Sequence, residues 1–194
     1  SLILFLKFDS SIPDFQFQES YPWIGSLGVK LAFGVDGIGL PLVLLSNIVI
    51  PLTIIFAWGE TKQANQFYGL ILLELVGVLG VFTSLDFFVF YIFWEIVLIP
   101  MYFLISMWGG PRKDYAAIKF FIYTHVASLV MLLAIFSLYF NAWQITGSPN
   151  FSIPDLLKYY SVIESTMLRD VIFLALLFGF IVKMPAVPFH TWLP

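Results

Sequence analysis

The sequence contains no cysteine and only two histidines among its 194 residues. Without cysteine it cannot form a disulfide, a thiolate metal site or an iron–sulfur cluster, and two isolated histidines do not form a metal-ligand pattern. We therefore expect no cofactor and no metal in this chain, and any redox centre in another one.

Charge is scarce as well. Asp, Glu, Lys and Arg make up 11% of the residues, whereas 60% are apolar; soluble domains carry about a quarter charged residues. The formal net charge of -3 argues against a nucleic-acid surface. The composition predicts an all-α, polytopic membrane protein whose first partner is the lipid bilayer.

Apolar runs alternate with polar stretches that contain proline and glycine. A run of about twenty apolar residues spans a bilayer as a helix. We expect the end of one helix at 1–8, an external loop at 9–34, membrane helices at 35–58, 67–84, 86–107 and 115–140, a second external loop at 141–169, and a broken membrane helix at 170–194. This gives about five membrane helices plus the end of another.

The ends and loops of the chain carry further information. The sequence starts without Met and inside an apolar run, so we expect a fragment that lacks at least one earlier helix. The short loops hold Lys62, Arg112 and Lys113, with Lys119 just inside the adjoining helix, whereas acidic residues outnumber basic ones in the two long loops. The positive-inside rule therefore predicts cytoplasmic short loops and external long loops.

One carboxylate, Glu95, lies inside an otherwise apolar run. It follows Asp86 by nine positions, so a helical rise of about 1.5 Å per residue puts it roughly 13 Å into the membrane. Ionisable groups at that depth are costly and tend to mark ion routes. The alternative is a protonated glutamate that only hydrogen-bonds a neighbouring helix.

A lone cation in comparable surroundings is Lys183, near the end of the last apolar run and beside Pro185 and Pro188. Both prolines lack an N–H group, so they predict a break that membranes tolerate only where protein or water surrounds it. The proton affinity of a buried lysine depends on whether a carboxylate is near. We predict that Lys183 and Glu95 form a proton-transfer pair; the alternative is snorkelling of Lys183 to the near interface.

Three weaker candidates complete the set of proton-carrying residues. Lys119 and His125 share the helix at 115–140, and the unperturbed pKa of a histidine side chain lies near neutrality, so both are candidate relay positions. A helix-end lysine and a core histidine are the competing interpretations. His190 follows the broken helix and is a further candidate.

The helix at 67–84 also contains an acid. Glu74 is roughly 10 Å deep by helical rise and is interpreted as pairing with another helix or subunit, ranked below Glu95. Gly69, Gly77 and Gly80, with Ser84, favour close packing of helices rather than a site.

Two stretches resemble the signature sequences of the antiporter-like subunits of respiratory complex I. They are residues 93–105, FWEIVLIPMYFLI, and residues 183–194, KMPAVPFHTWLP. The M-type chain, subunit 4, is the best match, and GVDGI at 34–38 with AIKFFIYT at 117–124 extends the resemblance over most of the sequence.

The resemblance implies a fourteen-helix subunit with two inverted repeats, of which this sequence supplies the end of the second helix through the seventh. In that family Glu95 and Lys183 would form the charge pair of the first half-channel. The implied function is proton translocation within a complex-I-like dehydrogenase, with an NADH- or reduced-deazaflavin-type donor and a quinone-like acceptor. Iron–sulfur clusters, flavin and quinone are then expected in partner membrane and peripheral subunits.

Other functions and locations stay open at this point. A multisubunit cation/proton antiporter, a membrane-bound hydrogenase and a structural membrane anchor are the alternatives, and single charges rather than repeated rings disfavour a channel. The expected location is the prokaryotic plasma membrane, with a mitochondrial or other energy-coupling membrane as the alternative.

Overall fold

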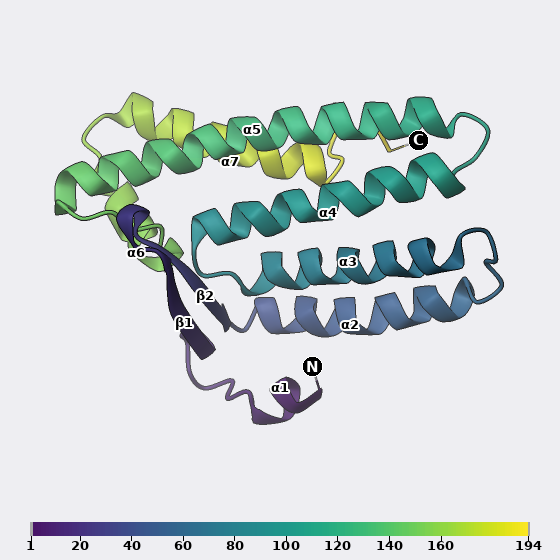
Figure 1. The fold of residues 1–194 in the computed structure, drawn as a ribbon. Coiled ribbons are helices and arrows are strands. Elements are labelled where there is room, and N and C mark those ends of the chain that lie inside the picture. Colours follow the sequence, from purple (N-terminus) through teal and green to yellow (C-terminus); the bar gives the residue numbers. More distant parts are fainter. Residues whose placement is uncertain (1, 194) are drawn as a thin grey trace.

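A computed structural model describes residues 2–193. Ser1, the first residue of the first expected segment, and Pro194, the last residue of the last one, lie outside the described residues. Four long helices lie side by side, and a fifth packs against the last of them (Figure 1). The helices are α1 Leu2–Lys7, α2 Gly39–Phe56, α3 Ala64–Thr83, α4 Phe87–Trp108, α5 Lys113–Thr146, α6 Ile153–Tyr160 and α7 Thr166–Lys183. The strands are β1 Gln16–Ile24 and β2 Val29–Val35.

Helices α2, α3, α4 and α5 are long and apolar enough to cross a membrane. The fold is therefore that of a predominantly helical, polytopic membrane protein, as the composition predicts. Helix α5 has 34 residues, about 51 Å at 1.5 Å per residue, and so exceeds the roughly 30 Å hydrocarbon core. Helix α7 is shorter and carries Arg169, Asp170 and Lys183; that it crosses the membrane stays a prediction.

The stretch expected as an external loop at 9–34 contains a β-hairpin. Strands β1 and β2 pair antiparallel, with Glu19 opposite Phe33 and Tyr21 opposite Leu31. The register shifts next to Pro22, which lacks the N–H that a regular ladder needs. The polar composition and this proline give no strand signal in the sequence. The hairpin forms because contacts with distant segments stabilise it.

Those contacts converge on the short connection between α3 and α4. The Leu85 N–H donates to the Ala32 carbonyl of β2 at 2.8 Å, and the Ile153 N–H donates to the Leu85 carbonyl at 2.9 Å. The Asp86 carboxylate caps α4 through the Phe88 N–H at 2.9 Å and accepts the Lys30 N–H of β2 at 3.0 Å. One side chain thus joins the hairpin to the first turn of α4.

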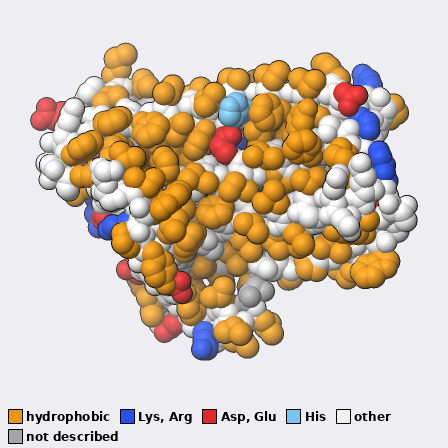
Figure 2. Space-filling view, viewed as in Figure 1, with side chains coloured by type: hydrophobic (Ala, Val, Ile, Leu, Met, Phe, Trp, Pro, Cys, Tyr) orange, Lys and Arg blue, Asp and Glu red, His pale blue; other side chains and the backbone are white. Residues whose placement is uncertain are grey.

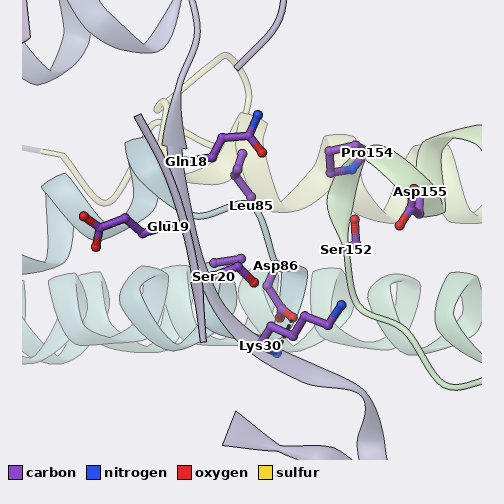
Figure 3. A pocket seen from close by; sticks show the side chains of 10 residues that line it. Gln18, Glu19, Ser20, Lys30, Leu85, Asp86, Ser152, Pro154 and Asp155 are labelled. Carbon is purple, nitrogen blue, oxygen red and sulfur yellow. Dashed lines mark hydrogen bonds between the residues drawn. The ribbon is translucent and has the colours of Figure 1, made fainter. Parts of the chain in front are cut away.

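A polar cavity of about 190 Å³ lies beside this junction, and Figure 3 shows Lys30, Asp86, Ser152 and Asp155 around it. Burial raises the pKa of the Asp86 carboxyl, whereas the hydrogen bonds that the carboxylate accepts from backbone N–H groups lower this pKa and so oppose the shift. With only 1% of its surface exposed and its oxygens bonded to backbone, Asp86 stabilises the fold here.

Helices α3 and α4 approach closely because two glycines of α3 face α4. A Cβ atom on Gly80 would lie 2.1 Å from the Phe93 ring, and one on Gly77 would lie 2.7 Å from a methyl group of Val97. A Cβ on Gly69 would meet nothing within 4 Å. Close packing of α3 on α4 therefore depends on Gly77 and Gly80, not on Gly69.

This difference gives a stability prediction. We expect Gly80→Ala to lower the free energy of unfolding by about 1–3 kcal/mol, because the added methyl overpacks the contact with Phe93. Gly69→Ala is the matched control and should leave stability unchanged or raise it by up to about 1 kcal/mol. Thermal unfolding in detergent, followed by circular dichroism, measures both; equal losses would contradict the assignment of Gly80 to the interface.

Candidate functional site

Helix α5 holds the Glu95 carboxylate of α4 through two side chains. Glu95 Oε2 lies 3.0 Å from His125 Nδ1, and Ser128 donates its hydroxyl hydrogen to Glu95 Oε1. His125 and Ser128 lie three residues apart and therefore on the same face of α5. The Phe121 ring stacks on the imidazole with centroids 5.3 Å apart. Both carboxylate oxygens thus have a partner on the neighbouring helix.

The Glu95–His125 pair opens onto the apolar surface of the bundle. The His125 side chain is 38% exposed and the Glu95 side chain 22%. Figure 2 shows one histidine beside one acid among hydrophobic side chains on this face. Because Glu95 lies on a membrane-crossing helix, the carboxyl group of Glu95 and the imidazole of His125 are both accessible from the surface of the bundle at membrane depth.

Lys183 is the last residue of α7 and packs on α4. Its Nζ lies 5.0 Å from the centre of the Trp94 ring, a cation–π geometry. Trp94 also packs edge-to-face on Phe180 with centroids 5.4 Å apart, which joins α4 to α7. A cavity of about 190 Å³ is lined by Lys183 together with Val78, Val81, Phe82, Trp94 and Val97.

The structure does not show the direct ion pair that we expect between Glu95 and Lys183. Among residues 2–193, neither Glu95 nor Glu74 has a carboxylate oxygen within 4.0 Å of Lys183 Nζ. Both acids nevertheless lie near enough to attract the ammonium electrostatically. Proton exchange between Glu95 and Lys183 stays a prediction; the ammonium lies over the Trp94 ring instead.

Helix α7 ends at Lys183, and the chain after it folds back on the helix. The Ala186 N–H donates to the Ile181 carbonyl at 3.1 Å, and the Trp192 indole N–H donates to the Val182 carbonyl at 2.9 Å. These donors replace those that a continuous helix would have supplied, since Pro185 has none. The break beside Lys183 is therefore a hydrogen-bonded structure.

Lys119 contacts this segment rather than the Glu95 cluster. Its ammonium donates to the Thr191 carbonyl, and the Thr191 hydroxyl lies 3.2 Å from the Tyr123 hydroxyl. Lys119 and Tyr123 of α5 thus hold the chain that follows Lys183. His190 is exposed in the same segment. The structure brings His125 to Glu95 but brings neither Lys119 nor His190 to it.

The stretch that carries these residues matches a known family. The family described as NADH:quinone oxidoreductase/Mrp antiporter, TM, matches residues 84–194. The chain belongs to this family. The match includes Glu95, His125, Ser128 and Lys183, and it confirms the resemblance found in the sequence motifs.

Individual relatives agree with this membership. The chain is 52% identical over 195 residues to F(420)H(2) dehydrogenase subunit M of Methanosarcina mazei, covering 100% of this chain and 39% of that protein. It is 38% identical over 191 residues to NADH-quinone oxidoreductase subunit M of Escherichia coli, covering 95% and 37%. Respiratory complex I from Thermus thermophilus contains a similar chain, with a TM-score of 0.84, 32% identity and coverage of 100% and 38%. The chain thus spans well under half the length of these relatives.

Two residues of the site escape the sequence analysis. Ser128 has a signal in retrospect, because it lies one turn after His125. Trp94 has none, since it is one of many aromatic residues in apolar runs. Within residues 2–193 no group of three or more His, Asp or Glu side chains is placed to hold a metal ion; the location of cofactors in partner subunits stays a prediction.

The geometry predicts different coupling energies for the two partners of Glu95. A double-mutant cycle with Glu95→Gln and His125→Leu should give a coupling of about 1–2 kcal/mol, because a hydrogen bond to a charged group is lost. The same cycle with Lys183→Ala serves as the control and should give less, since no direct contact joins that pair. Unfolding in detergent measures both. A larger coupling for Lys183 would show that the direct ion pair forms in solution.

Proposed function

We propose that this chain is part of a proton-translocating membrane subunit of a complex-I-like dehydrogenase, in which Glu95 and Lys183 take up and pass on the proton. The observation that carries the proposal is the Glu95 carboxylate, held by α5 on a membrane-crossing helix, with the Lys183 ammonium over the ring of the neighbouring residue Trp94. Family membership supports the same class of function. The chain performs no redox chemistry of its own in this proposal.

The proton moves because the surroundings of Lys183 change. Glu95 stabilises the protonated lysine by electrostatic attraction. A rearrangement driven by redox chemistry elsewhere alters their separation, and the lysine then passes its proton on. Several kcal/mol are available, since one pKa unit corresponds to about 1.4 kcal/mol. The Trp94 ring offers the ammonium a second favourable position while the carboxylate is distant.

The remaining candidates have different roles in this proposal. His125 orients the Glu95 carboxylate and is the candidate relay to it, because its ring is both bonded to Oε2 and partly exposed. Lys119 fixes the segment after Lys183 through Thr191 and thereby fixes the position of the broken helix end. His190 stays a weaker candidate for proton transfer near that end.

The assembly around the chain is also part of the proposal. The names of its relatives support a donor of the NADH or reduced-deazaflavin type and a quinone-like acceptor. Iron–sulfur clusters and flavin then lie in other membrane and peripheral subunits, and the location is the plasma membrane of a prokaryote. A subunit of a free cation/proton antiporter is the second candidate, because the family description covers both classes. Co-purification with iron–sulfur and quinone-site subunits would exclude the free antiporter.

The central test removes one charge. We expect Glu95→Gln in the complete, assembled complex to lower proton pumping at least tenfold, because the amide cannot carry a proton or hold Lys183 protonated. Glu164→Gln, an exposed acid in the loop before α7, is the control and should pump normally. Pumping in proteoliposomes and assembly on native gels are measured together. Wild-type pumping by assembled Glu95→Gln would reject the mechanism, and loss of assembly by Lys183→Ala alone would favour a structural anchor.

A further inference from the structure

Glu74 is a buried acid to which the proposed function assigns no role. It lies ten residues after the start of α3, about 15 Å along the helix axis. Its Oε2 atom is buried and has no hydrogen-bond partner among residues 2–193. A buried carboxylate oxygen without a partner is costly, so its presence in the middle of a membrane helix needs a physical reason.

Two cavities meet at the helix face that carries Glu74. The first, of about 320 Å³, lies between α2 and α3 and is lined by Glu74, Ser46, Val78 and Phe82 together with apolar residues of α2. The second contains Lys183 and is also lined by Val78 and Phe82. Positions 74, 78 and 82 follow one face of α3 at four-residue spacing. Val78 and Phe82 therefore separate Glu74 from the cavity of Lys183.

The first cavity has room for water beside Glu74, because its volume of about 320 Å³ far exceeds the roughly 10–15 Å³ that a cavity needs to hold one water. The Glu74 carboxylate and the Ser46 hydroxyl oxygen, whose hydrogen is donated to the Leu42 carbonyl, are the two polar groups there that can accept hydrogen bonds from water. In Figure 1, α3 lies between α2 and α4, so this cavity and the Glu95 cluster lie on different sides of α3. The charges of Glu74 and Glu95 both act electrostatically on Lys183.

We propose that Glu74 is a second proton-carrying carboxylate, which receives the proton of Lys183 past Val78 and Phe82 and releases it into the cavity between α2 and α3. This inference rests on the proposed function and names the acceptor of its proton. Because no carboxylate oxygen lies within 4.0 Å of Lys183 Nζ, one or more waters, or a swing of the lysine side chain, bridge the gap.

The transfer conserves charge at each step. The transfer begins after the rearrangement that separates Lys183 from Glu95, when Glu95 has taken up a proton, Lys183 is an ammonium and Glu74 is a carboxylate. Lys183 breaks one N–H bond and Glu74 gains the O–H bond, which leaves a neutral amine between two carboxylic acids. Glu95 then gives its proton to the amine. The net charge of the three groups is zero throughout, as an apolar environment favours.

The first test changes the acid in the complete, assembled complex. Glu74→Gln should lower proton pumping at least fivefold, whereas Glu74→Asp, which keeps a carboxylate, should restore most of it. Val78→Phe should also lower pumping, because the larger ring fills the passage. Val76→Phe, on the exposed face of α3, is the matched control for added volume and should not. Normal pumping by Glu74→Gln, with loss in Glu95→Gln, overturns this inference and leaves the proposed function standing; normal pumping in both overturns the proposed function.

The second test does not depend on pumping or on full assembly of the Glu74 variants. A hydrophobic carbodiimide reacts with protonated carboxyl groups in apolar surroundings, and peptide mass spectrometry locates the adduct. Removing the ammonium in Lys183→Ala should leave more of Glu74 protonated and raise its labelling at least twofold, while labelling of Glu164 stays constant. Unchanged labelling of Glu74 would show that Lys183 and Glu74 are not coupled and would overturn the inference.

Discussion

The constraint on which this structure depends is the cost of charge inside an apolar layer of helices. Each charged group is compensated differently. The Glu95 carboxylate receives His125 and Ser128 from α5, Lys183 lies over the Trp94 ring, and Glu74 has an oxygen without a partner among the described residues. The compensation requires α3, α4, α5 and α7 to meet around one depth of the bundle.

Packing of the helices supplies the precision that this compensation needs. Gly77 and Gly80 let α3 approach α4, and the edge-to-face contact of Trp94 with Phe180 places the end of α7 against α4. Interiors packed in this way move between discrete arrangements rather than deforming continuously. In the proposed mechanism, a small shift of α7 relative to α4 changes which acid Lys183 faces, and the segment after α7, which Lys119 contacts through the Thr191 carbonyl, is next to that change.

The sequence predicts those features that depend on local chemistry. The apolar run that forms α4 stands out in the sequence, and isolated charge in apolar runs is what makes Glu95 and Lys183 candidate residues. The hairpin is not predictable in this way, because its bonds to Leu85 and Asp86 join segments more than fifty residues apart. The contact of Glu95 with His125 escapes prediction for a related reason: α5 is apolar around most of its circumference, so its rotation relative to α4 is set by packing alone.

Two acids and one lysine lie at this depth, and the net charge of these three groups depends on how many protons they share. One ammonium and two ionised carboxylates have a net charge of -1, which an apolar environment disfavours; one extra proton makes the set neutral. In the transfer that we propose, that proton resides on whichever acid the ammonium does not neutralise, so the position of Lys183 decides which carboxylate is protonated. A single acid and a lysine that share one mobile proton would have only two states, an ion pair and a neutral pair. In the proposed function, the second acid gives the proton a destination different from its origin, and transport requires such a direction.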